Sequence, residues 1–278
     1  MTDIRQFCGQ LLKLMIKRFL TVCLLFAGLG LAAQEKSAAD SISGFSGSVG
    51  ITNNGFSIIP TFSLNSPAAI VNLAWQKKRF SFEPDIRLVP DASKGGLIWW
   101  FRYRLVDRKK FGVRVGAHPA FSLVRRNITE NGSTTTITEM LRFAAFEIVP
   151  SYQISKRFGV SAMFLEGHGL QKHGPQTTRV LFLNTAVTQI PLSAQLRMHL
   201  FPTLFFLNTD GFKGSYFTMT AALSHNQSPF KLQYTINQTF KSDVPGNKEF
   251  MWNVLLGYGF SRKYKRHYPN STGINSGF

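Results

Sequence analysis

Basic side chains that alternate with apolar residues are the groups in this sequence with the clearest capacity for chemistry. In segment 97–105, Arg102 and Arg104 share one face of an extended chain, while Tyr103 and Leu105 share the other. Basic groups gathered around one cavity would create a positive field that attracts anions, because low-dielectric walls focus that field. The side chains that the alternation places on such a face are Arg87, Arg102, Arg104, Arg114, Arg197 and Lys231, with His118 and His199.

Acidic residues on the same faces set up the opposite interpretation. Glu83 and Asp85 alternate with apolar residues in segment 80–88, which also holds Arg87. If each arginine pairs with an acid inside a narrow, filled interior, the basic groups bind and carry nothing. For any single arginine this pairing interpretation is as strong as the anion interpretation.

Histidine and serine offer a second chemistry, hydrolysis by a serine that a histidine activates. The candidates are His118 with Ser122, His168 alone, and His225 with Ser228. His118 and His168 lack a serine two residues on, His225 and Ser228 lie in a predicted periplasmic turn, and a lone histidine in a strand is usually structural. We therefore predict no catalytic residue, no metal site and no cofactor, and we predict that the chain is not an enzyme.

The elements that must position these side chains are segments of about ten residues in which large apolar residues alternate with small or polar ones. The clearest is Phe250–Phe260, where six large apolar residues share one face and the other face thins to glycine. About ten residues is the length with which a tilted β-strand crosses a bilayer, and the pattern recurs about a dozen times. The sequence therefore predicts an all-β, transmembrane, antiparallel up-and-down β-barrel of about twelve strands, with ten or fourteen as the alternatives.

The order of turns and loops supports this architecture. From Ala69 onward, short turns alternate with longer loops along the chain, as in barrels with short periplasmic turns and longer extracellular loops. Counting back from the last strand gives Phe56–Leu64 as the first, although Pro60 is unusual inside a central strand. Gly44–Ile51 is then a spare lead-in strand, and Arg125–Glu139 is a long polar extracellular loop.

Composition separates this architecture from its rivals. The 278 residues are 44% hydrophobic but only 17% charged, where about 25% is usual in soluble domains. A soluble β-sandwich also alternates, but the apolar face here is more aromatic than a closed soluble barrel could hold inside. The net charge of +18 invites a nucleic-acid partner, yet the basic residues are scattered over short turns and single strand positions, so we predict none.

The N-terminus has the three parts of a secretory signal. Lys17 and Arg18 precede the apolar run Phe19–Leu31, and Leu-Ala-Ala stands before Gln34. The start codon is Met1 or Met15, and both cysteines lie upstream of residue 34. We therefore divide the chain into an extension plus signal peptide (1–33), a polar leader (34–55), the barrel (56–260) and a basic periplasmic tail (261–278), and we expect it in the outer membrane.

The last strand resembles the terminal strand of Gram-negative outer-membrane barrels, which ends in an aromatic residue with further aromatics at alternate positions. Trp252, Tyr258 and Phe260 match that pattern, although Ser261–Phe278 continues the chain beyond it. The resemblance implies that these residues are read by the barrel assembly machinery and that outer-membrane lipid surrounds the barrel. The Ala–Gln junction at the signal resembles signal peptides of Bacteroidetes.

In strand number and lumen charge the chain resembles small twelve-stranded porins for acidic oligosaccharides. This implies a channel for small solutes, with anions preferred. One alternative is an outer-membrane lipid-modifying hydrolase, although the His-x-Ser spacing of outer-membrane phospholipases and lipid A deacylases is missing here. The other is a non-conducting binding or structural barrel with Arg125–Glu139 as its binding loop. The sequence leaves the oligomeric state open.

Overall fold

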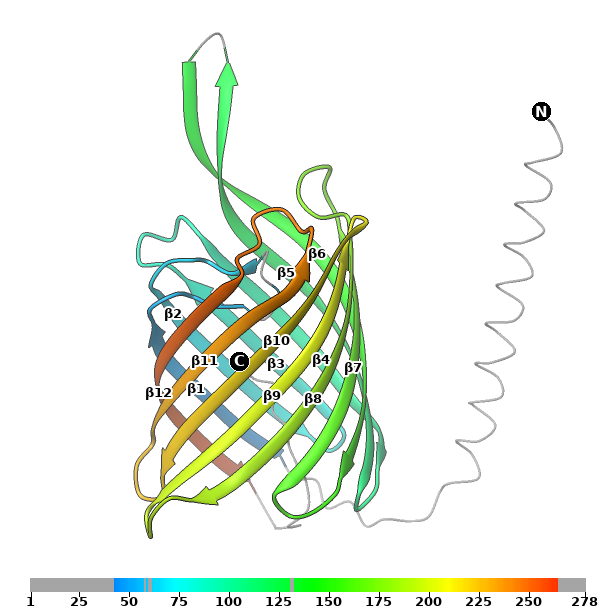
Figure 1. Cartoon of the computed structure of the whole chain (residues 1–278), viewed down its shortest axis with the longest axis vertical. Coiled ribbons are helices and arrows are strands. Elements are labelled where there is room, and N and C mark those ends of the chain that lie inside the picture. Colours follow the sequence, from blue (N-terminus) through cyan, green and yellow to red (C-terminus); the bar gives the residue numbers. More distant parts are fainter. Residues whose placement is uncertain (1–42, 58, 60–61, 131–132, 265–278) are drawn as a thin grey trace, which may run out of the picture. The chain divides into compact units, whose positions relative to one another are not determined.

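Each strand pairs antiparallel with its sequence neighbours, and the last strand pairs with the first, so the sheet closes on itself (Figure 1). The computed structural model describes residues 43–57, 59, 62–130 and 133–264. This closed up-and-down order confirms the predicted fold class and strand number. The twelve strands of the described residues are β1 (Ser43–Thr52), β2 (Ala68–Lys77), β3 (Phe80–Leu88), β4 (Gly95–Asp107), β5 (Phe111–Glu130), β6 (Ser133–Gln153), β7 (Phe158–Gly169), β8 (Thr177–Pro191), β9 (Leu196–Thr209), β10 (Phe212–His225), β11 (Phe230–Ser242) and β12 (Phe250–Tyr264).

The two ends of the barrel differ in their connections. At one end, which we call the short-turn end, the strands are joined by residues 78–79, 108–110, 154–157, 192–195 and 226–229. At the other, the loop end, lie the connections 89–94, 170–176, 210–211 and 243–249, together with the described residues of 53–67 and the adjoining ends of β5 and β6. Outer-membrane barrels place their short turns on the periplasmic side, so the loop end is the extracellular end in such a membrane.

Strands β5 and β6 extend past the loop end as a long hairpin (Figure 1). Their register runs without a break to Glu130 opposite Ser133. The prediction of an irregular loop over Arg125–Glu139 was therefore wrong. The segment is rich in β-branched threonine, which favours strands, and cross-strand pairs such as Thr136 with Asn127, at 2.8 Å, join its two arms.

The first strand also differs from the prediction. Ser43–Thr52 is β1, whereas the described residues of 56–64 form part of a loop-end connection and hold Phe56 and Leu64 buried. The barrel therefore occupies 43–264 rather than 56–260, and it takes residues from both the expected leader and the expected tail. Gly55, at φ +51°, turns the chain out of the sheet. The expected signal peptide and most of the expected tail lie outside the described residues, so both stay predictions.

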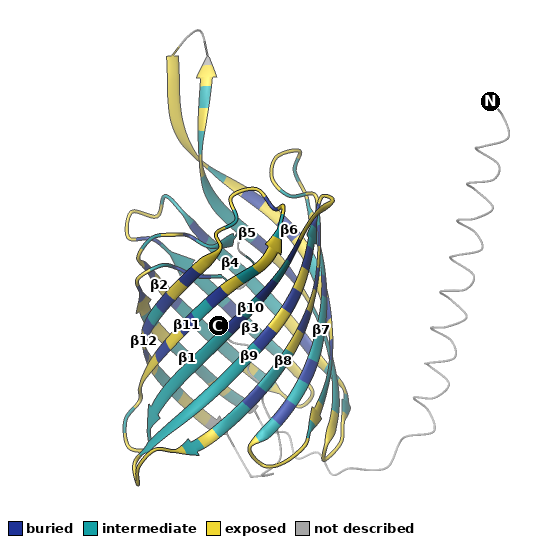
Figure 2. Ribbon diagram, viewed as in Figure 1, coloured by how far each residue is buried: buried dark blue, intermediate teal, exposed yellow. Residues whose placement is uncertain are grey.

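The outer wall is apolar and aromatic, and it is exposed (Figure 2). Trp75, Phe101, Phe206 and Trp252 each leave between 44% and 49% of their surface uncovered. A soluble protein does not expose so continuous an apolar surface, because water disfavours it, whereas lipid accepts it. No helix in the described ranges is long and apolar enough to cross a membrane.

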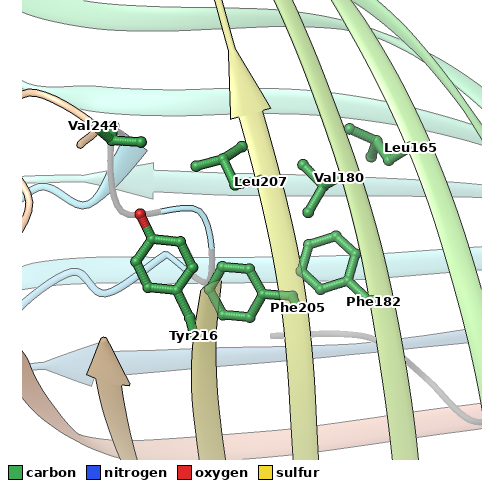
Figure 3. Packing of buried hydrophobic residues seen from close by; sticks show 7 residues of the cluster. All are labelled: Leu165, Val180, Phe182, Phe205, Leu207, Tyr216 and Val244. Carbon is green, nitrogen blue, oxygen red and sulfur yellow. The ribbon is translucent and has the colours of Figure 1, made fainter. Parts of the chain in front are cut away.

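An apolar cluster fills part of the barrel interior toward the loop end. Rings of Phe182, Phe205 and Tyr216, from β8, β9 and β10, lie side by side (Figure 3), with centroids 5.3 and 4.6 Å apart. Val244 joins them from the connection 243–249, and Ile59 packs on the same cluster from 53–67. We call this group the lumen plug; its members are Leu165, Val180, Phe182, Phe205, Leu207, Tyr216 and Val244, with Ile59, Trp100 and Met163 packed against them.

Candidate functional site

The inner wall carries four of the predicted arginines, and each of them contacts an acid. Arg102 Nε donates to Glu147 Oε1 at 2.8 Å, and its guanidinium also bonds Glu83. Arg114 Nε lies 3.3 Å from the same Glu147 oxygen. Glu147 is 1% exposed and Arg102 5% exposed. Buried charges of this kind are tolerated only when they are paired and hydrogen-bonded. The two arginines, Arg102 and Arg114, and the two acids, Glu83 and Glu147, therefore form one electrically balanced cluster.

The register of the strands explains how Arg102 on β4 reaches Glu147 on β6. Gly116 on β5 lies between them, directly opposite each in its ladder. A Cβ atom on Gly116 would lie 2.9 Å from Arg102 Cγ and 3.0 Å from Glu147 Oε1. The ion pair therefore crosses β5 over a position that has no side chain.

Trp100 links this ion cluster to the lumen plug. The guanidinium carbon of Arg102 lies 4.1 Å from the centroid of the Trp100 ring, a cation–π distance. His118 packs against the other side of this group, with its ring centroid 4.0 Å from that of Trp100. Trp100 also packs against the lumen plug. The charged part and the apolar part of the interior therefore form one continuous packed structure.

The other two paired arginines lie toward the ends of the barrel. Arg87 makes a bidentate pair with Asp85 at 2.7 and 2.9 Å and donates to the carbonyl of Phe56 at 2.8 Å. That last bond ties the connection 53–67 to the wall. Arg104 pairs with Asp107 at 3.0 Å, beside the short-turn end.

Arg197 and Lys231 form a different arrangement. They lie on β9 and β11, each opposite Ser224 of β10, and so sit at one level near the short-turn end. His199 Nε2 lies 3.1 Å from Ser224 Oγ in the same group. Among the residues that the structure describes, neither Arg197 nor Lys231 forms an ion pair with an acid. Among the side chains that the structure describes on the inner wall, these two cations are therefore an unbalanced positive charge.

The rest of the inner wall is polar without charge. Hydroxyl and amide groups pair across β8–β11, as in Thr218 with Asn237 at 3.1 Å and Thr220 with Thr235 at 3.0 Å. Asn237 is fully buried. On β1 the inward positions are small, with Ser46, Ser48 and Gly50 in succession. This surface is compatible with water, in contrast to the lumen plug above it.

Sequence reasoning missed Glu147, the acid that holds two of the arginines. It lies in the run Phe143–Val149, in which all the remaining residues are apolar. That isolation was the available signal, since a lone charge in an apolar strand needs a partner.

The histidine–serine candidates do not assemble into a hydrolase site. His118 packs edge to face against Trp100, and His168 Nε2 lies 3.4 Å from Glu166 Oε1. His225 lies 2.8 Å from Gln195 at the short-turn end. Across the described ranges, no hydrogen bond joins any of these three histidines to a serine hydroxyl, whereas His199 lies beside Ser224. No group of three His, Cys, Asp or Glu in those ranges is placed to hold a metal ion.

The terminal-strand aromatics face outward. Trp252 and Tyr258 are 48% and 46% exposed, and Tyr258 packs edge-on against Phe230 at 5.5 Å. Phe260 lies 5.8 Å from Phe45 of β1, ring to ring, where the barrel closes. Their predicted recognition by the assembly machinery stays a prediction.

A closed antiparallel barrel with a lipid-compatible aromatic wall and short turns at one end defines the class: the chain is an outer-membrane β-barrel. No family model and no curated protein matches the sequence. Solved structures do match. The β domain of the Bordetella autotransporter BrkA is 10% identical, with TM-score 0.45 and coverage of 80% of this chain and 100% of that one. The KdgM porin is also 10% identical, with TM-score 0.45 and coverage of 77% and 99%. LpxR from Salmonella typhimurium is 8% identical, with TM-score 0.43 and coverage of 77% and 99%.

These matches correct one prediction. We expected that the chain is not an enzyme, but the matched barrels are not of one functional kind, since LpxR stands beside a porin. A fold that hosts different functions does not exclude catalysis. The exclusion was therefore wrong, and enzymatic activity stays undetermined at identities of 7–10%.

Proposed function

We propose that the protein is an outer-membrane channel for small solutes whose lumen is closed at the loop end by the lumen plug. The observation that supports this most is the division of the interior. Its short-turn half is lined by paired charges, hydroxyls, amides and small residues, which tolerate water, and its loop-end half holds the apolar lumen plug. Two members of the apolar part, Ile59 and Val244, come from connections rather than from the wall. Connections can move without opening the barrel itself.

The channel opens, in this proposal, when Ile59 and the neighbouring described residues of the connection 53–67 leave the lumen. Ile59 then separates from the lumen plug, and the Arg87 bond to the Phe56 carbonyl breaks. The unbalanced cations Arg197 and Lys231 give the open channel a mild preference for anions, because they line the path at the short-turn end.

Single-channel recording in planar bilayers tests the proposal. Wild-type barrels should be mostly closed, with rare openings. The change Ile59→Asn places an amide against the lumen plug, which costs roughly 1–3 kcal/mol in the closed state. The open fraction should therefore rise roughly tenfold or more.

A conservative change, Ile59→Val, is the matched control and should leave the open fraction close to wild type. If folded Ile59→Asn barrels and a second plug variant, Val244→Asn, both stay silent, the barrel is not a channel. The non-conducting interpretation would then replace this one.

A further inference from the structure

A groove of about 520 Å³ indents the outer wall across β6–β9. Its sides are large apolar residues, among them Tyr152 and Leu183, and its floor is made where Pro150, Ala162 and Pro202 present little side chain. The volume lies within the range of small-ligand sites, roughly 300–1,000 Å³.

Two prolines within central strands account for the hollow. Pairing between β6 and β7 stops after Ile148–Phe164 and resumes at Ser151–Ser161, on either side of Pro150. Pairing between β8 and β9 likewise stops after Asn184–Thr203 and resumes at Val187–Leu200, around Pro202. Proline has no N–H to donate to a ladder, so it is found in central strands mainly where pairing is interrupted.

A concentration of positive charge lies directly beyond one end of the groove. Phe111 and Tyr152, which line that end, are partners at the start of β5 and the end of β6. The backbone N–H of Gln153 donates to the carbonyl of Lys110 at 2.7 Å, which holds the adjoining turns together. The exposed cations of these two turns are Arg108, Lys109, Lys110, Lys156 and Arg157.

The charge is uneven around the short-turn end, where the turns 78–79, 108–110 and 154–157 are basic. The turns 192–195 and 226–229, which serve β8–β9 and β10–β11, hold no Lys, Arg, Asp or Glu. The basic turns therefore adjoin the end of the groove nearest the short-turn end, where the headgroups of the periplasmic leaflet lie in an outer membrane.

We propose that the groove and the two basic turns together bind one anionic phospholipid of the periplasmic leaflet. An acyl chain fills the groove along Pro150, Ala162 and Pro202. The headgroup phosphate lies among the cations of turns 108–110 and 154–157, where Lys and Arg pair with phosphate. This site is on the outside of the barrel and does not depend on whether the lumen conducts.

A second copy of the chain is the competing occupant, and charge argues against it. A dimer with a twofold axis buries the same patch on both subunits. Seating two grooves on each other would bring the same basic turns of both copies toward one another. A lipid phosphate instead supplies the opposite charge.

Native mass spectrometry of the detergent-purified, folded barrel tests the proposal, with phosphatidylglycerol and phosphatidylcholine of equal chain length as probes. Wild type should retain one phosphatidylglycerol in preference to phosphatidylcholine. Changing Lys109, Lys110, Lys156 and Arg157 to Gln together should remove the preference, on the order of tenfold. The matched control changes Lys77, Lys78 and Arg79 to Gln in the basic turn of β2–β3, which is outside the groove, and should keep it.

Filling the groove tests the acyl-chain half. Ala162→Trp should reduce retention of both lipids alike, and Thr185→Phe fills the groove from β8 if the tryptophan variant fails to fold. Equal retention by wild type and by both folded variants would overturn the proposal. A second result would also overturn the proposal: the folded wild type is a dimer without bound lipid, and either groove variant is a monomer. The groove would then be a contact between two copies of the chain.

Discussion

At the scale of single residues, Glu147 determines the charge of the lumen wall. Its carboxylate contacts both Arg102 and Arg114, and Glu83 supplies the second acid of the cluster. Two arginines and two acids cancel, so this wall offers no net attraction to an anion. The interpretation that arginines pair inside the barrel therefore describes β3–β6 better than a basic track does.

Removal of that carboxylate should destabilise the barrel strongly. Glu147→Gln leaves Arg102 and Arg114 buried with one acid between them, and breaking a buried pair in this way costs about 3–5 kcal/mol. Urea unfolding of the barrel in lipid vesicles, followed by tryptophan fluorescence, measures the loss. Glu139→Gln, which breaks the partly exposed pair with Arg126, is the control and should cost about 0–1 kcal/mol. Equal effects of the two changes would contradict the role given to Glu147.

Gly116 should tolerate no side chain. A methyl group there meets Arg102 and Glu147 at 2.9–3.0 Å, so Gly116→Ala forces the ion pair apart, and overpacking of this kind typically costs about 1–3 kcal/mol. Gly96→Ala on β4 is the control, because the nearest atom to its new Cβ is 4.0 Å away. The same vesicle unfolding assay compares them, and a Gly116→Ala barrel as stable as the Gly96→Ala barrel would show that the crossing is not tight.

Alternation alone placed the arginines on the inner face, because period 2 is a local property. It did not reveal their partners. Glu147 is 45 residues from Arg102 in sequence, and they meet only because β4, β5 and β6 pair in one particular register. Register depends on the whole sheet, so single-strand patterns do not determine it.

At the scale of elements, β1 shows why a strand can escape a hydrophobicity pattern. Its inward positions are glycine and serine, so its alternation is weak, and an apolar loop segment beside it alternates better. Strand pairing nevertheless places Ser43–Thr52, and not the loop segment, in the sheet. β1 makes ten register pairs with β12 and ten with β2, which no loop segment could replace.

The closing contact of the barrel is Phe260 over Gly47. The two residues are cross-strand partners, and a Cβ on Gly47 would lie 2.6 Å from the Phe260 ring. An aromatic ring that covers a glycine in this way stabilises a strand pair. The terminal aromatic therefore has a structural use in the β1–β12 seam, in addition to its predicted use in assembly.

Phe260→Ala should weaken that seam. We expect a loss of roughly 0.5–1.5 kcal/mol beyond the loss of apolar contact, because the ring also packs near Phe45. Folding into detergent-free lipid vesicles, followed by the heat-dependent shift of the band on gels, measures it without assembly factors. Phe250→Ala, at the other end of β12, is the control. A Phe260→Ala barrel as stable as this control would leave Phe260 with the assembly role alone.

At the scale of the whole molecule, charge and apolarity are distributed by position along the barrel axis. The apolar lumen plug lies in the loop-end half, balanced ion pairs join the strands of one wall, and Arg197 and Lys231 lie at the short-turn end without an acidic partner among the described residues. The alternation within single strands predicted a basic lumen. The structure restricts that charge to one level, because the acids needed to cancel the rest come from strands that the sequence alone does not bring together.

Arg197 and Lys231 should therefore control ion selectivity. In the opened background Ile59→Asn, changing both to Gln should bring the anion-to-cation permeability ratio down toward one, since the remaining lumen arginines are neutralised by their acids. Reversal potentials under a salt gradient measure the ratio. They should be taken at low ionic strength, because the Debye length is only about 10 Å at 0.1 M. Lys94→Gln with Lys172→Gln removes two cations from the loop end, outside the focusing walls, and should change the ratio little. A selectivity that follows the loop-end pair, or a background channel that prefers cations, would show that Arg197 and Lys231 do not set the field.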